Sequence, residues 1–214
     1  MGTLTQSCVL KDIASRFLLV LLSIETILQE TTIYRGRQRL SAAKNGLGLG
    51  GVYEATLGRI KAQGGDKARL GMAVLMWISH SRRPLQVDEI CHALAIQIGS
   101  SDLGSDDIPA ISTSLGCCQG LVTVDKGAST VRLIHFTIQE YLCTLPDFVR
   151  AHSTIAETCL TYLNSRHVKD LSTDSTPDPR GTPFLEYSSL YWGGAHMRME
   201  LSDLVKEFAL QLLD

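Results

Sequence analysis

The feature that most constrains the fold is a pair of β-rich runs near the middle of the chain. The runs "LVTVD" (121–125) and "TVRLIH" (130–135) are separated by the four residues "KGAS", which contain a Lys-Gly turn signal. Two β-rich runs joined by so short a segment predict a β-hairpin. A helical pattern begins at Phe136, so His135 stands at the junction between the second strand and a helix.

Two helical patterns and a short extended piece come before the hairpin. Residues 67–80 repeat apolar side chains at the spacing of one helix face, and the pattern stops before Pro84. The piece "PLQV" is expected to be extended. Asp88 is then expected to cap a helix over residues 89–96 with its side-chain carboxylate.

A third helix is expected after the acidic loop that follows. Asp107 is expected to be its N-cap, Pro109 to lie in its first turn, and the helix to end near Cys118. The resulting order is helix, short strand, helix, helix, strand, turn, strand. That order predicts a winged helix, which is a three-helix helix-turn-helix core with a β-wing.

Helical patterns also flank this region, so the expected fold class is mainly α with a small β-wing. The flanking helices are expected over residues 12–30, 52–63, 149–164, 184–198 and 201–213. We expect three parts: a helical segment over 1–64, a winged-helix domain over 65–148, and a helical extension over 149–214. The extension contains a Pro-rich loop at 172–183.

The composition gives no reason to expect a nucleic-acid or membrane partner. The 214 residues carry a formal net charge of -2 and a pI near 6.3, so no overall positive field attracts anionic polymers. The apolar run Phe17–Leu28 is too short to span a bilayer and contains Glu25. The six cysteines show no zinc-type spacing and fit reduced thiols in a cytoplasmic protein.

No motif assembles a catalytic or metal site, so a non-enzymatic role is expected. The segment "GLGLGG" (46–51) lacks the Lys-Ser/Thr and the preceding strand of a phosphate loop. No G-x-S-x-G sequence marks a nucleophilic serine, and Cys117 and Cys118 have no basic neighbour in sequence. The six histidines include no pair at helical ligand spacing, so no metal site is expected.

The predicted recognition helix argues against DNA binding. In DNA-binding winged helices, this helix carries basic or amide side chains that reach bases and phosphates. Here it is "IPAISTSLGCCQ" (108–119), which contains no basic residue, and the wing offers only Lys126 and Arg132. Because phosphate contacts supply most of the affinity for DNA, the sequence favours a winged helix that faces protein.

Four segments resemble a known family in their order and spacing. They are "GVYEATLGRIKAQ", "LMWISHSRRPLQVDEICHALAI", "VRLIHFTIQEYL" and "FLEYSSLYWGGAHMR". Over residues 12–200, the chain resembles the region just after the NTPase core of fungal NACHT-type STAND proteins. That region contains the winged-helix domain named after GPI inositol-deacylase and usually precedes ankyrin or WD40 repeats.

The resemblance implies a regulatory or interaction module that couples nucleotide state to effector or repeat domains. Residues 1–64 resemble the lid of a NACHT NTPase, whereas the phosphate loop, the Mg²⁺-binding acidic strand and the sensor region are absent. The implied partners are a NACHT nucleotide-binding core, in cis or in trans, and repeat domains. ATP or ADP would bind only through an attached NTPase core, so no cofactor is expected in this chain.

The same resemblance implies a specific role for His135. In related STAND ATPases, a histidine at the end of the winged-helix strand contacts the β-phosphate of ADP and holds the inactive state. His135 occupies the matching corner, and an imidazole can donate a hydrogen bond to phosphate. The structural alternative is that His135 bonds a neighbouring backbone group and closes the hairpin.

Two further functions remain open from the residues alone. A standalone adaptor would bind a protein through the wing or through the aromatic helix with Tyr187, Tyr191 and Trp192, although large aromatic side chains also dominate cores. A transcription-type winged helix would bind DNA in a salt-sensitive manner. The sequence makes no prediction of the oligomeric state.

Overall fold

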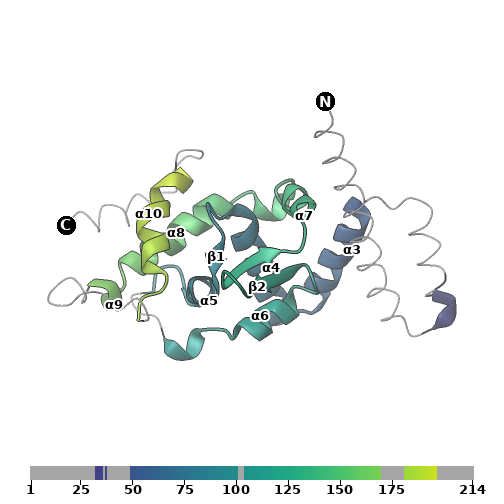
Figure 1. Cartoon of the computed structure of the whole chain (residues 1–214), viewed down its shortest axis with the longest axis horizontal. Coiled ribbons are helices and arrows are strands. Elements are labelled where there is room, and N and C mark those ends of the chain that lie inside the picture. The colour runs from purple at the N-terminus through teal and green to yellow at the C-terminus, as the bar shows by residue number, and fades with distance from the viewer. Residues whose placement is uncertain (1–31, 36, 38–48, 101–103, 170–180, 197–214) are drawn as a thin grey trace.

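The described part of the chain is mainly α-helical, with one small antiparallel sheet (Figure 1). A computed structural model describes residues 32–35, 37, 49–100, 104–169 and 181–196. The helices predicted over 12–30 and 201–213 lie outside these residues. The elements are α3 (Leu49–Ala62), α4 (Gly65–His80), β1 (Leu85–Gln86), α5 (Val87–Ala95), η1 (Ser105–Asp107), α6 (Ile111–Cys117), β2 (Val122–Asp125), β3 (Thr130–Leu133), α7 (Phe136–Leu142), η2 (Pro146–Phe148), α8 (Ala151–Leu163), α9 (Arg166–Lys169) and α10 (Leu185–His196).

The elements from α4 to β3 form a winged helix, which confirms the predicted fold class. The sheet has the order β1-β3-β2, and both pairs are antiparallel. Leu85 of β1 pairs with Val131 of β3, and Val124 of β2 pairs with the same residue from the other side. The short piece before α5 therefore completes the wing that β2 and β3 begin.

The wing turns where the Lys-Gly signal predicted. Asp125 Oδ1 accepts hydrogen bonds from the N–H of Gly127 at 3.0 Å and the N–H of Ala128 at 3.4 Å. Aspartate commonly bonds the backbone two residues on in this way, which fixes a turn without a longer loop. Across the hairpin, Arg132 Nη1 lies 3.0 Å from Asp125 Oδ2. The side chain of Asp125 thus stabilises both the turn and the pairing of β2 with β3.

The corner between α4 and α5 depends on a buried carboxylate. Glu89 is only 4% exposed, and its two oxygens accept from both terminal nitrogens of Arg83 at 2.6 and 2.7 Å. Glu89 also accepts from the N–H of Gln86 at 2.8 Å, which completes a capping box at the start of α5. The predicted cap was therefore wrong: Gln86 is the N-cap, and Asp88 lies inside the helix.

The start of α6 also differs from the prediction. Asp107 ends the short helix η1, where its N–H donates to the carbonyl of Gly104 at 3.1 Å, and it does not cap α6. Pro109 precedes the helix, and Ala110 is the N-cap. Proline disfavours helical geometry in the residue before it, so the chain cannot continue helically from Ile108 through Pro109.

A glycine brings α4 and α6 unusually close together. A Cβ atom placed on Gly71 would lie 2.7 Å from the carbonyl oxygen of Cys117 and 2.9 Å from Cγ2 of Ile60. Real Cβ atoms do not approach backbone oxygen this closely, so only glycine fits where α3, α4 and α6 meet. The backbone of α6, at the position of the recognition helix, therefore packs directly against α4.

One hydrophobic core extends from α3 to α10. At its centre, Trp77 of α4 lies edge-on to Phe184 and Tyr187, with ring centroids 5.7 and 6.1 Å apart. Tyr162 of α8 meets Phe184 edge-on at 5.3 Å, and Figure 1 shows α10 lying across α8. The helical extension thus shares its core with the winged helix, while the proposed limit at residue 148 stays a prediction.

The linker after α4 is also bonded to α10. The N–H of Arg82 donates to the hydroxyl of Tyr187 at 3.2 Å, and the Arg83 guanidinium lies 5.2 Å from the centre of the Tyr187 ring. The same guanidinium lies 5.8 Å from the ring of Tyr191. Such contacts of a cation with ring faces stabilise the packing beyond the effect of the buried area.

None of the helices in the described residues has both the length and the apolar character that a membrane span requires.

We predict that Phe184→Ala lowers the free energy of unfolding by about 3–5 kcal/mol, because it leaves a cavity beside Trp77 and Tyr162. Leu190→Ala is the matched control, since Leu190 lies on α10, the helix that begins directly after Phe184, but is 63% exposed, and it should change stability by less than about 0.5 kcal/mol. Urea denaturation of both variants measures the difference. Equal losses of unfolding free energy in the two variants would contradict a dependence of α10 on this core.

Candidate functional site

The corner between β3 and α7 is the candidate functional site. The wing ends where the N–H of Ile134 donates to the carbonyl of Leu121 at 3.1 Å. His135 follows in an extended conformation, with φ -152° and ψ 145°, and is the N-cap of α7. Its ring is half-buried and packs against the ring of Phe136, with centroids 4.5 Å apart. The strand-to-helix change expected at His135 is confirmed.

Three side chains form a line of hydrogen bonds that ends at the His135 ring. The Tyr53 hydroxyl on α3 lies 2.7 Å from Thr137 Oγ1, which in turn lies 2.7 Å from His135 Nδ1. The N–H of Thr137 also donates to Nδ1, at 3.3 Å. Tyr53 is 1% exposed, and its burial raises the pKa of the phenol. The ring orientation is therefore set by residues on two different helices.

This arrangement assigns the tautomer of His135. A backbone N–H can donate to Nδ1 only if that nitrogen carries no proton. In the neutral ring, the proton then lies on Nε2, and the hydroxyls of Tyr53 and Thr137 donate in sequence toward Nδ1. Among the described residues, none forms a hydrogen bond with Nε2. The corner thus holds an N–H donor in a fixed direction at a half-buried position.

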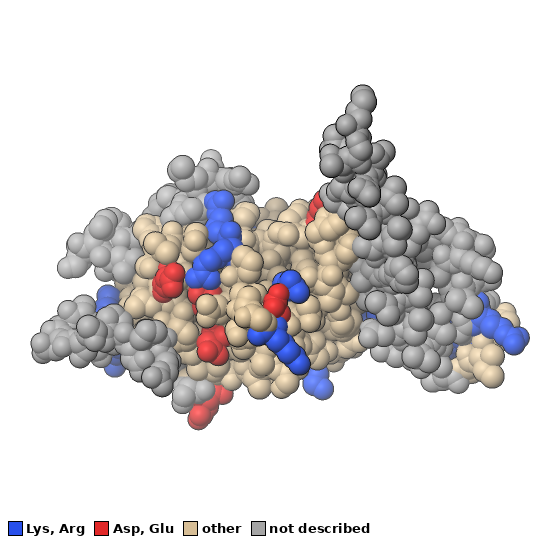
Figure 2. Space-filling model, viewed as in Figure 1, with Lys and Arg blue, Asp and Glu red and all other residues tan. Residues whose placement is uncertain are grey.

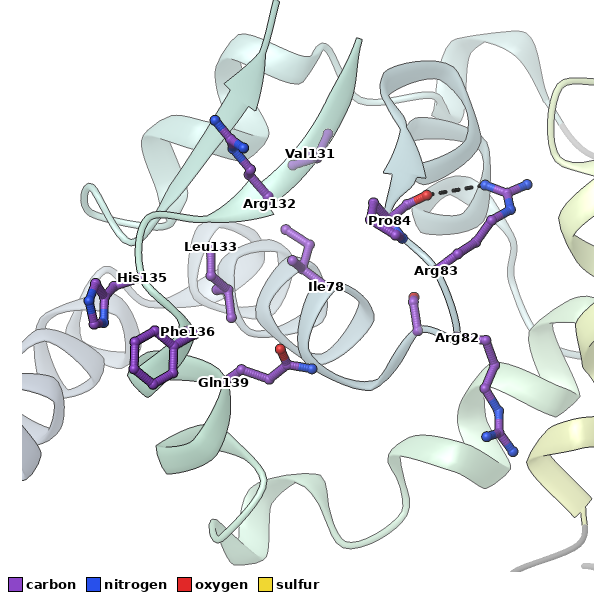
Figure 3. Close-up of a pocket in the computed structure, with 11 residues that line it drawn as sticks. Ile78, Arg82, Arg83, Pro84, Val131, Arg132, Leu133, His135, Phe136 and Gln139 are labelled. Atoms are coloured by element: carbon purple, nitrogen blue, oxygen red, sulfur yellow. Dashed lines mark hydrogen bonds between the residues drawn. The ribbon is translucent and has the colours of Figure 1, made fainter. Parts of the chain in front are cut away.

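A cavity of about 380 Å³ adjoins the corner (Figure 3). The linker Arg82–Pro84 lines one side, β3 with His135 and Phe136 lines the other, and Ile78 of α4 lies between them. Gln139 closes one end, where its side-chain amide donates to the carbonyl of Ser79 at 3.0 Å. The lining includes three arginines and no carboxylate. The cavity is therefore suited to a ligand that is partly apolar and partly anionic.

The aromatic residues proposed for partner binding lie mostly inside the fold. Tyr187 is fully buried, with 0% exposure, in the core beside Trp77. Tyr191 and Trp192 are half-buried and pack against the same core. Because Tyr187 is not exposed, a partner that bound this helix in the present conformation could contact only Tyr191 and Trp192.

The α6 helix presents no cation at the position of a recognition helix. Its most exposed residues are Ser112, Thr113 and Gly116, and its Cys117 is buried toward α4. On the face shown in Figure 2, basic and acidic side chains of the described residues lie next to one another without a continuous basic surface. The exposed residues of α6 are thus uncharged, and the protein-facing role expected of the winged helix stays a prediction.

In the described part of the chain, no metal site is assembled and two of the thiols are buried in the core. No cluster of three or more histidine, cysteine or acidic residues there could hold a metal ion. Burial raises the pKa of the Cys118 thiol to about 12, and it raises the pKa of Cys159 as well. A buried thiol with a raised pKa is a poor nucleophile. These two cysteines therefore act as small core residues.

The sequence reasoning missed the residues that support His135. The sequence predicts only that Tyr53 and Thr137 lie in helices. A signal for Thr137 exists, because threonine in the first turn of a helix often bonds a capping residue. No comparable signal exists for Tyr53, which is 84 residues from Thr137 in sequence.

The fold and the comparison with known families both indicate a winged helix. The α4–β3 topology defines a winged-helix protein with additional helices on both sides. Residues 59–159 match the family model described as "GPI inositol-deacylase, winged helix domain", so this part of the chain is similar to that domain. The match begins within α3 and ends within α8, and it includes His135. No curated protein and no solved structure is significantly similar to the chain.

We predict that His135→Ala lowers the free energy of unfolding by about 1 kcal/mol, whereas His135→Asn leaves it nearly unchanged. Alanine removes the acceptor for the N–H of Thr137, and asparagine is among the best N-caps and restores an acceptor. Urea denaturation at neutral pH distinguishes the two variants. Equal losses in both would mean that ring packing on Phe136, and not capping, holds the corner.

A second histidine, His80, lies where α4 meets α8. The His80 ring packs edge-on against Phe148 at 5.7 Å and against His152 at 5.4 Å. Its Nδ1 lies 2.8 Å from the Ser79 hydroxyl and 3.2 Å from the carbonyl of Met76. Burial lowers the pKa of His80, the nearby His152 lowers it further, and only the Met76 bond opposes them.

We therefore predict that His80 makes the fold less stable in acid. The pKa of His80 is lower in the folded chain than the ordinary value of about 6.5, so the unfolded chain binds the proton first as pH falls. The stability of wild type should drop between pH 7 and pH 5 by more than that of His80→Gln. Phe148→Leu, which disturbs the same contact but keeps the imidazole, should retain the wild-type slope. A slope that His80→Gln leaves intact contradicts the prediction.

Proposed function

We propose that the chain is a non-enzymatic regulatory and interaction module of a STAND-type (NACHT) signalling protein. In this proposal, the winged helix couples the nucleotide state of a NACHT core, in cis or in trans, to effector or repeat domains in the cytoplasm. The observation that carries the proposal is the geometry of His135, whose Nδ1 is occupied by Thr137 while Nε2 is left as a fixed donor.

The geometry supports a contact with the β-phosphate of ADP. A neutral imidazole held with its proton on Nε2 can donate one hydrogen bond to a phosphate oxygen without further reorganisation. Hydrogen bonds to charged groups contribute about 1.5–3 kcal/mol, which is enough to bias a two-state switch. The chain itself would hold no nucleotide, because a phosphate loop and a magnesium site would come from the partner core.

The proposal includes neither catalysis nor DNA binding. The family description names an inositol deacylase, but the sequence has no G-x-S-x-G motif to provide a nucleophilic serine. The exposed residues of α6 are uncharged, so they would forgo the phosphate contacts on which DNA affinity depends. A protein partner is the remaining class, and it agrees with the neutral surface of the recognition helix.

The test is the size and nucleotide content of the endogenous polypeptide that contains this sequence. We expect antibodies against the chain to isolate a polypeptide or complex that includes an NTPase core and releases ADP on denaturation. A freestanding polypeptide near 23.4 kDa without nucleotide would contradict the proposal and favour a standalone adaptor.

His135→Asn, introduced into the same protein, tests the role of the imidazole. The variant keeps an acceptor for the helix cap while it removes the imidazole with its Nε2 donor, so capping is controlled within one substitution. We expect ADP to dissociate about tenfold faster, as the loss of about 1.4 kcal/mol implies. Unchanged ADP release in this variant would rule out the contact between His135 and phosphate.

A further inference from the structure

The helix α3 is anchored near its C-terminal end. Ile60 is fully buried in the core, and the side-chain amide of Gln63, just after the helix, donates to the carbonyl oxygen of Cys117 at 2.8 Å. Lys61 Nζ also lies 2.7 Å from Asp147 Oδ1. Because these contacts hold the end of α3 against α6 and η2, a displacement that arrives from the residues before α3 acts first on its N-terminal half.

Tyr53 connects the N-terminal half of α3 to the corner of His135. Figure 1 shows α3 beside α7, and the Tyr53 ring packs against Tyr141 of α7 with centroids 5.4 Å apart. Burial raises the pKa of the Tyr53 phenol, so its hydroxyl keeps the proton and is able to donate. Among the described residues, this hydroxyl bonds only Thr137 Oγ1. The same oxygen lies 2.7 Å from His135 Nδ1, so the Thr137 hydroxyl is bonded both to α3 and to the imidazole.

This line of hydrogen bonds is sensitive to small movements. The oxygens of Tyr53 and Thr137 are 2.7 Å apart, and a hydroxyl pair no longer bonds beyond about 3.5 Å, so a displacement of about 1 Å breaks the bond. Hydrogen bonds in a chain polarise one another, so loss of the first weakens the second. Threonine in a helix has two accessible χ1 rotamers, and the bond to Tyr53 favours the one that reaches His135. Once Tyr53 is displaced, the N–H of Thr137 at 3.3 Å is the bond that still fixes Nδ1.

We propose that Tyr53 is a positioning residue through which α3 controls the direction of the His135 imidazole. When α3 lies against α7, Tyr53 fixes the Thr137 hydroxyl and, through it, the ring. When the N-terminal half of α3 is displaced, the ring gains freedom to turn. The positioning depends only on bonds within this chain. Its consequence for nucleotide rests on the proposed function, because the Nε2 donor of the same ring would contact ADP.

The control would come from outside the matched domain. Tyr53 precedes residues 59–159, whereas Thr137 and His135 lie within them. A partner that moves the segment before α3 would therefore change the direction of the imidazole without touching it. The controlling residue and the controlled ring are distant in sequence but only two hydrogen bonds apart in space.

The test is ¹⁵N NMR of the histidine rings in the 214-residue chain at about pH 8, where a histidine of ordinary pKa is neutral. Tyr53→Phe keeps the aromatic ring and removes the hydroxyl. We expect the His135 Nδ1 resonance to move toward the frequency of a nitrogen without a hydrogen-bond donor. His135→Asn identifies the resonance by its absence. An unchanged Nδ1 resonance in Tyr53→Phe would overturn the proposal.

Tyr187→Phe is the matched control. Tyr187 is also a buried tyrosine, and its hydroxyl accepts from the N–H of Arg82 at 3.2 Å, so this variant loses a comparable hydrogen bond in another part of the core. It should leave the His135 Nδ1 resonance at its wild-type position. Equal changes in Tyr53→Phe and Tyr187→Phe would mean that a general loosening of the core moves the ring, which contradicts the proposal.

Variants of Thr137 test whether Tyr53 acts through this hydroxyl. Thr137→Ser keeps the hydroxyl and should retain the wild-type Nδ1 resonance. Thr137→Val removes the hydroxyl and leaves the backbone N–H, so adding Tyr53→Phe to it should cause no further change. A further change as large as that of Tyr53→Phe alone would show that Tyr53 affects the ring by another route, against the proposal.

Release of ADP tests the consequence in a polypeptide that also carries the NTPase core. Tyr53→Phe should speed this release about two- to tenfold, as the loss of one hydrogen bond implies. In the His135→Asn background it should have no effect, because its action depends on the imidazole. An equal effect in both backgrounds would contradict the positioning role. If His135→Asn itself leaves ADP release unchanged, the proposed function fails, and the Nδ1 resonances still decide the positioning role.

Discussion

The buried carboxylate of Glu89 is the constraint on which the path of the chain through the winged helix depends. A charge that is only 4% exposed needs nearby partners, because its transfer from water is otherwise costly. Arg83 and the N–H of Gln86 supply them. Because these residues are close in sequence, satisfying Glu89 fixes the direction in which the chain leaves α4 and brings β1 against β3.

The ion pair between Arg83 and Glu89 explains two further features of the fold. Arg83 reaches inward to Glu89 and lies over the ring of Tyr187, so it links α5 to α10. For that reason Arg83 does not extend β1 along β3, and Leu133 at the end of β3 has no paired residue in β1. The packing of the helical extension and the cavity in the wing therefore have one origin, which is the position of a single guanidinium.

The winged helix could be predicted from sequence because each element has its own local signal. Helical periodicity, β-rich runs and a Lys-Gly turn depend only on neighbouring residues. The caps of α5 and α6 could not be placed, since glutamine and alanine are unusual N-caps and Asp88 and Asp107 are favoured by general preference. The burial of Tyr187 and the support of His135 depend on pairs 105 and 84 residues apart. No local pattern encodes such pairs.

The aromatic centre of the core has a consequence for how such a domain is inherited. The family match ends at residue 159, but Trp77 finds its partners at Phe184 and Tyr187, beyond that limit. A recombination event that joined the matched region alone to a new protein would separate an indole from the rings that cover it. In this chain, the structural unit around Trp77 is therefore longer than the stretch that the family model matches.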